Sequence, residues 1–306
     1  MGHDITKLKG RDAMQLDQKI VVVTGASSGL GEATAKAMAQ HGARVALLAR
    51  NRERLGRIAA EITQRGGQAA TFPLDLTDPV AVERVSRAII SSLGVPDVIV
   101  NNAGAGRWQF TEETSPDDVV QAMAAPYFSA FYLTRAFLPE MLRRGTGHVL
   151  NVTSPVCFFA WPGASAYGAA RWAMRGFTEL LRADVAGTRL KVSLVCAGLI
   201  DTPYFDNNPA SKERIPGIGR MFRTLQPEEV AEAMVQAVER GQRDVVLPFL
   251  LKQTLRLQRV APWLIEWLIR RTGYRRPTKH IAPPTGARVT HIHPNRRGNG
   301  RPGRHP

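Results

Sequence analysis

Short apolar runs alternate with helix-periodic segments along the first 250 residues, and this alternation limits the chain to few folds. The runs lie at 19–24, 44–49, 68–73, 97–101, 148–152, 190–195 and 244–247. A short continuous apolar run is typical of a strand buried on both faces of a parallel sheet. The segments between the runs, such as 30–41 and 51–65, have helical periodicity. We therefore predict an α/β fold with a doubly wound parallel sheet, in one domain over residues 17–248.

The segments outside residues 17–248 differ in composition. Residues 1–16 are a polar leader without the apolar core of a secretion signal. Residues 249–271 are predicted to form an amphipathic helical extension, with Leu251 and Leu255 on one face and Lys252, Arg256 and Arg259 on another. Residues 272–306 are rich in Gly, Pro, Arg and His, which predicts a disordered basic tail. The sequence has no window of 18 uninterrupted apolar residues, so no membrane-spanning helix is predicted.

The net charge of +15 is unevenly distributed along the chain. Ten Lys and Arg residues and no carboxylate lie between Arg270 and the C-terminus, which leaves +5 for residues 1–269. The basic tail has neither interleaved aromatic residues nor a recognised module, so binding to nucleic acid is not expected. The only cysteines, Cys157 and Cys196, cannot build a disulfide framework, and His148 has no neighbouring metal ligands. We expect no metal site and a cytoplasmic protein, with peripheral attachment to the inner face of a membrane as an open alternative.

A glycine-rich loop follows the first predicted strand and leads into a helix. Its candidate cofactor-binding residues are Gly25, Ser27, Ser28, Gly29, Leu30 and Gly31. Glycines between a strand and a helix let backbone amides approach phosphate oxygens, and the helix dipole favours the anion. In a doubly wound sheet this first strand–helix unit is where dinucleotides bind, so the sequence predicts a Rossmann fold with a dinucleotide site.

The end of the second predicted strand indicates which dinucleotide binds. A site for NAD places Asp or Glu there to accept hydrogen bonds from the adenosine ribose. This chain instead has Arg50, whose guanidinium can bind a 2′-phosphate. We therefore predict NADP (NADPH) as the cofactor.

Several motifs in a fixed order make the chain resemble the classical short-chain dehydrogenases/reductases (SDR) over roughly residues 17–248. The motifs are TGASSGLG at 24–31, Asp75-Leu76, Asn101-Asn102-Ala103-Gly104, Ser154, and Tyr167 thirteen residues later. The resemblance implies hydride transfer between the nicotinamide and a carbonyl or alcohol carbon. It also implies further cofactor-binding residues, namely Asp75, Leu76, Asn102, Ala103, Gly104, Tyr167, Arg171, Gly198, Ile200 and Thr202.

The resemblance implies that Tyr167 is the catalytic acid/base and that Ser154 holds the substrate oxygen. An isolated phenol has a pKa near 10, so a nearby cation is needed to make it useful near neutral pH. The family supplies a lysine four residues after the tyrosine, where this chain has Arg171. An arginine still places positive charge beside the phenol, but it cannot pass on a proton as an ammonium can.

Two other positions depart from the family pattern. Pro126 stands where the family usually has the asparagine of its catalytic set, and Ala197 precedes Gly198 where a proline is usual. Proline has no side-chain amide and no backbone N–H. An alternative to an enzyme therefore stays open, namely a catalytically impaired relative that binds NADP or senses a ligand.

Aromatic residues gather in the segments expected beside the nicotinamide. They are Trp108, Phe110, Phe158, Phe159, Trp161, Tyr204 and Phe205. So many aromatic side chains predict a small lipophilic carbonyl or alcohol as substrate. The family resemblance also suggests a homo-oligomer. For residues 249–271 three interpretations remain: a lid on the substrate site or an oligomer contact, attachment to an anionic membrane surface together with the tail to residue 306, and nonspecific binding to nucleic acid.

Overall fold

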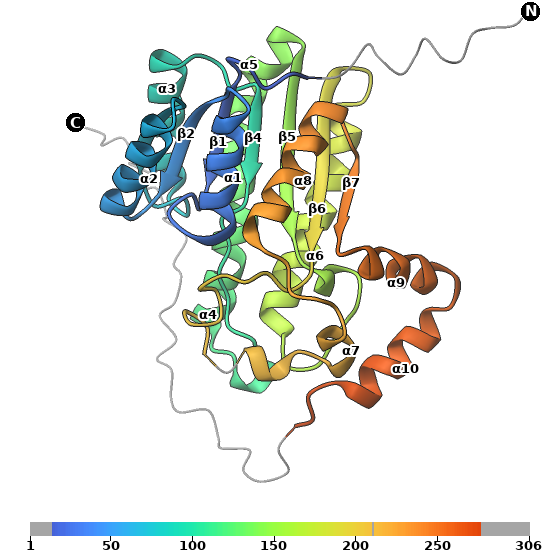
Figure 1. The fold of residues 1–306 in the computed structure, drawn as a ribbon. Coiled ribbons are helices and arrows are strands. Elements are labelled where there is room, and N and C mark those ends of the chain that lie inside the picture. Colours follow the sequence, from blue (N-terminus) through green and yellow to red (C-terminus); the bar gives the residue numbers. More distant parts are fainter. Residues whose placement is uncertain (1–13, 210, 277–306) are drawn as a thin grey trace, which may run out of the picture. The chain divides into compact units, whose positions relative to one another are not determined.

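Seven parallel strands form one sheet in the order β3-β2-β1-β4-β5-β6-β7 (Figure 1). The computed structural model describes residues 14–209 and 211–276. The strands are β1 (Ile20–Thr24), β2 (Arg44–Ala49), β3 (Gln68–Pro73), β4 (Val98–Asn101), β5 (Thr146–Thr153), β6 (Arg189–Ala197) and β7 (Asp244–Leu247). Each lies at one of the predicted apolar runs, and the predicted doubly wound α/β fold is confirmed.

Helices cover both faces of the sheet, which explains why its strands are apolar throughout. The helices of the sheet domain are α1 (Gly29–Gln40), α2 (Arg52–Gln64), α3 (Pro79–Ser92), α4 (Pro116–Met123), α5 (Ser129–Arg144), α6 (Ser165–Asp184) and α8 (Pro227–Arg240). Val21 and Val23 of β1 belong to one buried core with Met38 of α1, whereas Val22 belongs to the other core with Phe137 of α5. Side chains alternate along a strand, so a strand between two cores must be apolar at every position.

The strands that follow β1 in the sequence are added to the sheet first on one side of β1 and then on the other. The chain runs from β1 outward to β2 and β3, then crosses to β4 on the other side of β1 and continues outward to β7. Such a switch point leaves a crevice outside the carboxyl ends of β1 and β4, where open α/β sheets bind their ligands. The fold therefore places the ligand site next to the loop that follows β1.

Two helices follow the sheet domain and pack beside a short helix of the loop after β6. They are α9 (Phe249–Val260) and α10 (Pro262–Thr272), and the short helix is α7 (Gly217–Arg220). Pro262 is the first residue of α10, a position where proline is well tolerated and where it starts a new helix rather than extending α9. Leu251, Leu255, Ile265 and Ile269 form a third buried cluster together with Phe159 and Cys196. The predicted helical extension is thus a pair of helices.

The ends of the chain are described only in part. Met14 donates a backbone hydrogen bond to the Glu239 carbonyl oxygen (3.1 Å), and Leu16 is buried in the core, so the last residues of the predicted polar leader belong to the domain. Residues 1–13 and the predicted basic tail from residue 277 lie outside the described residues. In the described part of the chain, no helix has the length and apolar character needed to cross a membrane.

Candidate active site

The loop after β1 is fixed to the end of β4 by one hydroxyl and one amide. Thr24 Oγ1 donates to the Val100 carbonyl oxygen (3.1 Å) and accepts from the backbone amides of Asn102 and Ala103 (both 2.9 Å). The Asn102 side-chain amide donates to the Thr24 carbonyl oxygen (3.0 Å). These contacts join the first and fourth strand ends, so the two motifs form one rigid floor at the switch point.

Glycine is required at Gly31 because the loop folds back against the start of α1. A Cβ at this position would lie 2.2 Å from the Gly25 carbonyl oxygen and 2.6 Å from the Asn102 side-chain nitrogen. Within the described residues the Ser28 side chain makes no capping bond to α1. The first amides of that helix are therefore available to an anion, which the helix dipole also favours.

We expect Gly31→Ala to weaken binding of a reduced nicotinamide dinucleotide at least about tenfold. Overpacking of about 1–3 kcal/mol would displace the loop that is predicted to bind the phosphates. Binding can be measured from the fluorescence of the reduced nicotinamide. The matched control is Gly56→Ala on α2, where a Cβ meets nothing within 4 Å. Equal binding by the Gly31→Ala variant and the parent would contradict this role of the loop.

The adenosine end of the crevice combines one carboxylate with two arginines. Asp75 Oδ1 accepts from the backbone amide (2.9 Å) and the hydroxyl (2.8 Å) of Thr77. The Thr77 amide, with the Thr77 hydroxyl and the charge of Arg50, holds the pKa of Asp75 below its usual value. Arg50 and Arg54 both line the cavity, one after β2 and the other in the first turn of α2. Sequence reasoning identified Arg50 but missed Arg54, although the spacing of four residues could have revealed it.

Tyr167 and Arg171 lie one turn apart on α6 and are both buried. The Arg171 guanidinium carbon lies 5.0 Å from the centroid of the Tyr167 ring. Arg171 Nη1 makes a long contact of 3.5 Å with the Val152 carbonyl oxygen, and its Nε has no hydrogen-bond partner among the described residues. A Cβ on Gly104 would approach the guanidinium to 2.5 Å, so this glycine leaves room for it. The structure thus brings a phenol and a weakly partnered cation together.

A buried polar network holds α6 against the sheet. The Asn101 amide of β4 donates to Asn151 Oδ1 of β5 (2.8 Å), and the Asn151 amide donates to Thr178 Oγ1 of α6 (3.0 Å). All three residues are buried. These bonds join β4, β5 and α6 inside the core, where hydrogen bonds are strengthened by the low local dielectric constant, although Asn101 Oδ1 has no partner among the described residues. This network therefore sets the position of Tyr167 above the ends of β4 and β5.

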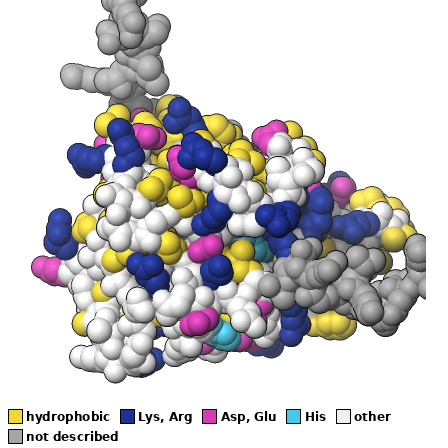
Figure 2. Space-filling model, turned by 90° about the horizontal axis from the view of Figure 1, so that it is seen from above, with side chains coloured by type: hydrophobic (Ala, Val, Ile, Leu, Met, Phe, Trp, Pro, Cys, Tyr) yellow, Lys and Arg dark blue, Asp and Glu magenta, His cyan; other side chains and the backbone are white. Residues whose placement is uncertain are grey.

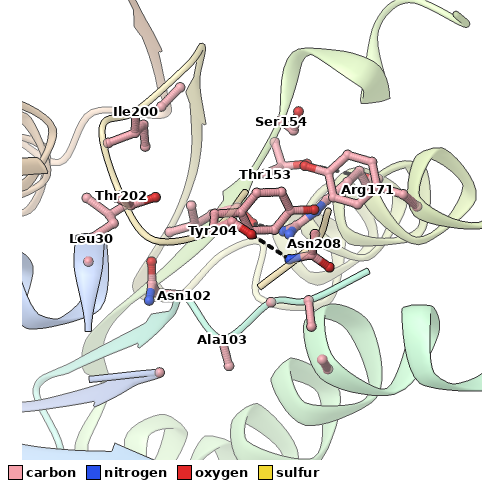
Figure 3. A pocket seen from close by; sticks show the side chains of 18 of the residues that line it. Leu30, Asn102, Ala103, Thr153, Ser154, Arg171, Ile200, Thr202, Tyr204 and Asn208 are labelled. Atoms are coloured by element: carbon pink, nitrogen blue, oxygen red, sulfur yellow. Dashed lines mark hydrogen bonds between the residues drawn. The ribbon is translucent and has the colours of Figure 1, made fainter. Parts of the chain in front are cut away.

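Ser154 follows β5 and precedes the 3₁₀ turn η4 (Pro155–Cys157). Figure 3 shows Ser154, Arg171, Tyr204 and Asn208 on one side of the pocket, with Leu30, Asn102 and Thr202 on the other. Ser154 and Arg171 thus lie across the pocket from Leu30 of the glycine-rich loop. This arrangement leaves space for a cofactor between them.

One cavity of about 1050 Å³ contains every residue that the sequence predicts to bind the cofactor or to act in catalysis. Its lining includes Gly25, Ser27, Ser28, Gly29, Leu30, Gly31, Arg50, Asp75, Leu76, Asn102, Ala103, Gly104, Ser154, Tyr167, Arg171, Gly198, Ile200 and Thr202. In the described parts of the chain no group of three His, Cys, Asp or Glu residues is arranged to hold a metal ion. Burial lowers the pKa of His148 to about 3, so this histidine is neutral.

Tyr204 contributes a second phenol to the cavity. The sequence predicted only that its aromatic ring would lie beside the nicotinamide. Its hydroxyl donates to the Gly106 carbonyl oxygen (2.8 Å) and accepts from Trp108 Nε1 (3.3 Å). Burial, and then the neighbouring Tyr167, raise the pKa of Tyr204 well above its usual value. Tyr204 therefore stays protonated and joins the loop after β6 to the loop after β4.

The aromatic prediction holds for five of the seven residues named. Trp108, Phe159, Trp161, Tyr204 and Phe205 line the cavity. The other two were placed wrongly. Phe110 packs instead against Tyr274 with a centroid distance of 6.0 Å, and Phe158 lies 4.2 Å from the Arg175 guanidinium carbon. Both rings have cationic or aromatic partners outside the cavity, which local sequence spacing does not reveal.

Pro126 lies in a π-helical turn, η3 (Ala124–Phe128), between α4 and α5. Proline cannot donate to the carbonyl four residues earlier, and a π-turn is a common way to accommodate such an interruption. Ala124 and Ala125 line the cavity, whereas Pro126 is buried and does not. Consequently no amide side chain enters the cavity from this position.

The far end of the cavity is closed by the helices that follow the sheet domain. Ile218 and Phe222 come from the α7 region, Thr254 from α9, and Ile265 and Ile269 from α10. Sequence reasoning kept a lid as one of three interpretations of residues 249–271, without identifying these residues. The isoleucines at i and i+4 show which face of α10 is involved.

The fold, the loop at its switch point and the buried Tyr167 and Arg171 are those of a dinucleotide-binding oxidoreductase. Residues 19–213 match the short chain dehydrogenase family. A dehydrogenase/reductase SDR family protein 7-like of Anopheles gambiae is 31% identical over 275 residues, which cover 85% of each chain. The chain therefore belongs to the short-chain dehydrogenase/reductase family, as its motifs predict.

Further relatives differ in cofactor and substrate. A fatty acyl-CoA reductase of Acinetobacter baylyi is 35% identical over 222 residues, which cover 72% of each chain. A solved short chain dehydrogenase/reductase of Burkholderia phymatum, in complex with NAD, is 24% identical with a TM-score of 0.73, covering 82% of this chain and 96% of that one. Other solved members of the family hold NADP or NADPH. The family thus includes both cofactors.

Proposed function

We propose that this chain is an NADP-dependent oxidoreductase that acts on a lipophilic carbonyl or alcohol. The observation that carries the proposal is the Tyr167 and Arg171 pair, buried in the same cavity as the dinucleotide loop. A protein that only binds NADP can use a cation here to hold the nicotinamide ribose, but it needs no phenol to exchange a proton with a substrate. Oxidation of NADPH by the purified protein in the presence of lipophilic ketones and aldehydes tests the proposal directly.

In the direction of reduction, the Tyr167 hydroxyl donates a proton to the substrate oxygen while the carbonyl carbon receives a hydride. A nicotinamide dinucleotide held in this cavity would supply that hydride from its C4 position. Ser154 holds the same oxygen by a hydrogen bond, and Arg171 stabilises the negative charge left on the phenol. In the direction of oxidation the phenolate takes the proton back. Because a guanidinium does not release protons, Tyr167 must be reprotonated through a route that bypasses Arg171.

The residues of the cavity fit a dinucleotide. The α1 amides and the glycine loop suit the pyrophosphate, and the unpartnered Nε of buried Arg171 suits a hydroxyl of the nicotinamide ribose. Thr202 lies beside Gly29 of the glycine-rich loop. A Cβ added to Gly29 would approach the Thr202 side chain to 3.2 Å. A carboxamide bound to this segment would lie close to the loop.

We expect Arg50→Ala to weaken NADPH binding about 10- to 100-fold and to change NADH binding less than about twofold. The reason is that hydrogen bonds between a guanidinium and a phosphate are worth about 1.5–3 kcal/mol, and NADH lacks the 2′-phosphate. Both constants can be measured by fluorescence titration. Arg52→Ala is the control, since Arg52 is exposed and does not line the cavity.

A variant that lost affinity for both cofactors equally, or for neither, would contradict the assignment of Arg50 to a 2′-phosphate. Arg54 is the second candidate for this contact, because it lines the cavity one helical turn further on. Adding Arg54→Ala to Arg50→Ala is expected to widen the gap between NADPH and NADH.

The lining of the substrate end supports a lipophilic substrate. Its side chains are Trp108, Phe159, Trp161, Phe205, Ile215, Ile218, Phe222, Ile265 and Ile269. The charged side chains in the lining of the whole cavity are Arg50, Arg54, Asp75 and Arg171. None of them belongs to this end, where an acidic or basic metabolite would have to bury an unpaired charge at a high cost. One relative is a fatty acyl-CoA reductase, and a fatty acyl group is the kind of apolar substrate that such a lining suits.

A further inference from the structure

The outer face of α9 and α10 exposes large apolar side chains. Val260 is 84% exposed, Trp263 69% and Trp267 54%, and Phe249, Leu250 and Leu257 are exposed on α9. Figure 1 shows the two helices projecting from the end of β7, beside α7. An apolar surface rimmed by polar residues usually marks a binding site. We name these six side chains the apolar ridge.

The apolar ridge is not needed to hold the two helices in place. Their opposite faces supply Leu251, Leu255, Ile265 and Ile269 to the third buried cluster. Two hydrogen bonds add to this packing, one from Gln258 Nε2 to the Phe158 carbonyl oxygen (2.6 Å) and one from the Ile218 amide to Thr272 Oγ1 (3.3 Å). The helix pair is thus anchored by one face and presents the other outward.

The charges around the apolar ridge are almost all positive. Lys252, Arg256, Arg259, Arg270 and Arg271 are exposed on α9 and α10, whereas Glu266 is the only carboxylate of these helices and pairs with Arg270 (3.3 Å). The opposite end of the domain is different, because Figure 2 shows Lys and Arg side chains there mixed with Asp and Glu. At that end Lys19 and Arg144 lie 3.7 Å and 3.4 Å from Asp97. Unbalanced positive charge is therefore concentrated at α9 and α10.

We propose that the apolar ridge inserts into the surface of an anionic lipid bilayer, with the basic side chains on the lipid headgroups. Tryptophans and leucines flanked by Lys and Arg are the composition of helices that lie in a membrane interface. A second copy of this chain fits less well, because two faces with four net positive charges each would repel one another. Nucleic acid would leave the apolar side chains uncovered.

The same helix faces the cavity on one side and the bilayer on the other. Ile265 and Ile269 line the substrate end, while Trp263 and Trp267 lie on the outer face of α10. A lipophilic substrate dissolved in the bilayer would thus meet α10 on its way into the cavity. This consequence rests on the proposed function, whereas binding to the bilayer does not.

The test is flotation of the full chain with vesicles of phosphatidylcholine, either alone or with about 30 mol% of the anionic lipid phosphatidylglycerol. We expect the parent protein to float with the anionic vesicles. Trp263→Ser with Trp267→Ser should weaken binding at least about tenfold, because the rings supply the buried apolar area. Lys252→Gln with Arg256→Gln and Arg259→Gln should weaken it about 100-fold, at about 1 kcal/mol, or a factor of five, for each charge.

The matched control is Val80→Ser with Leu142→Ser, which removes exposed apolar side chains from α3 and α5. It should bind the vesicles like the parent. A brominated phosphatidylcholine should quench the tryptophan fluorescence of the parent but not that of the tryptophan variant. NADPH binding and thermal unfolding should be unchanged in every variant, which separates a failure of this proposal from a failure of the proposed function.

Equal flotation of the tryptophan variant and the parent would overturn the proposal, and so would the absence of quenching. Either result would leave the charge of residues 277–306, which every variant keeps, as the cause of any binding. Loss of self-association in the tryptophan variant, without vesicle binding by the parent, would likewise overturn it and assign the apolar ridge to a contact between copies.

Discussion

Tyr167→Phe is expected to lower kcat/KM for hydride transfer about 10²- to 10⁴-fold, the range that a positioned acid or base contributes. The phenylalanine ring keeps the stacking on Trp108, whose centroid lies 5.2 Å away, and the contact with the Arg171 guanidinium. The fold and NADPH affinity should therefore be preserved. Steady-state rates and NADPH titration, measured on the same preparation, separate the chemical step from binding.

Tyr132→Phe is the matched control, because it removes a phenol on α5 that does not line the cavity. Its rate should equal that of the parent. Turnover that survives Tyr167→Phe unchanged would show that another group moves the proton. Tyr204 would be the first to examine, since its ring centroid lies 6.3 Å from that of Tyr167.

Arg171→Met is expected to lower turnover about 100-fold without destabilising the protein. The guanidinium carbon of Arg171 lies 5.0 Å from the centroid of the Tyr167 ring. A positive charge at about this distance stabilises a phenolate by about 3 kcal/mol at an effective dielectric constant near 20, which corresponds to a change of about 100-fold in the rate. The buried guanidinium has an unpartnered Nε and a single long contact through Nη1. Replacing such a group by an apolar side chain of similar length is typically neutral or stabilising.

A thermal unfolding midpoint that stays the same or rises, together with the loss of rate, would identify Arg171 as a functional group rather than a structural one. Arg182→Met is the contrasting control, because Arg182 has ion pairs with Glu179 (2.6 Å) and Asp244 (3.0 Å) that its loss would break. That variant should lose stability and keep its intrinsic rate. Unchanged turnover in Arg171→Met would show that the Arg171 cation does not stabilise the Tyr167 phenolate during the reaction.

A double variant, Arg171→Lys with Pro126→Asn, tests the catalytic competence of this chain's own residues. If the parent is an enzyme, it already turns over substrate, and the double variant changes the rate without creating activity. If the parent only binds NADP, it is silent with every carbonyl, and the double variant gains activity. Measuring both proteins on the same substrates separates the oxidoreductase from the binding protein.

Residues whose type is fixed by a constraint within a few positions of the sequence were predictable. The strand β1 is apolar at every position because it lies between two cores, and Gly31 is glycine because a Cβ would meet the Gly25 carbonyl oxygen. Both constraints leave a signature within a few residues. The family motifs added residues at fixed distances from these, and the candidate site residues among them, such as Ser154 and Tyr167, line one cavity.

Features that depend on contacts between distant segments were not predictable. The bond from Trp108 Nε1 to the Tyr204 hydroxyl joins residues 96 positions apart. Phe110 finds its partners Arg214 and Tyr274 more than 100 positions along the chain, so its location outside the cavity had no local signal. For residues 249–271 the sequence predicted an amphipathic extension with a lid as one interpretation, but only the structure shows that Ile265 and Ile269 of α10 line the cavity.

We claim above all that this chain moves hydride between NADPH and a lipophilic carbonyl. The most direct measurement supplies NADPH deuterated at both C4 positions, in parallel with equally labelled NADH, to a panel of lipophilic ketones and aldehydes. We expect deuterium on the former carbonyl carbon of at least one alcohol product, with NADPH preferred to NADH. Products without deuterium, or no turnover with any carbonyl despite tight NADPH binding, would contradict the claim.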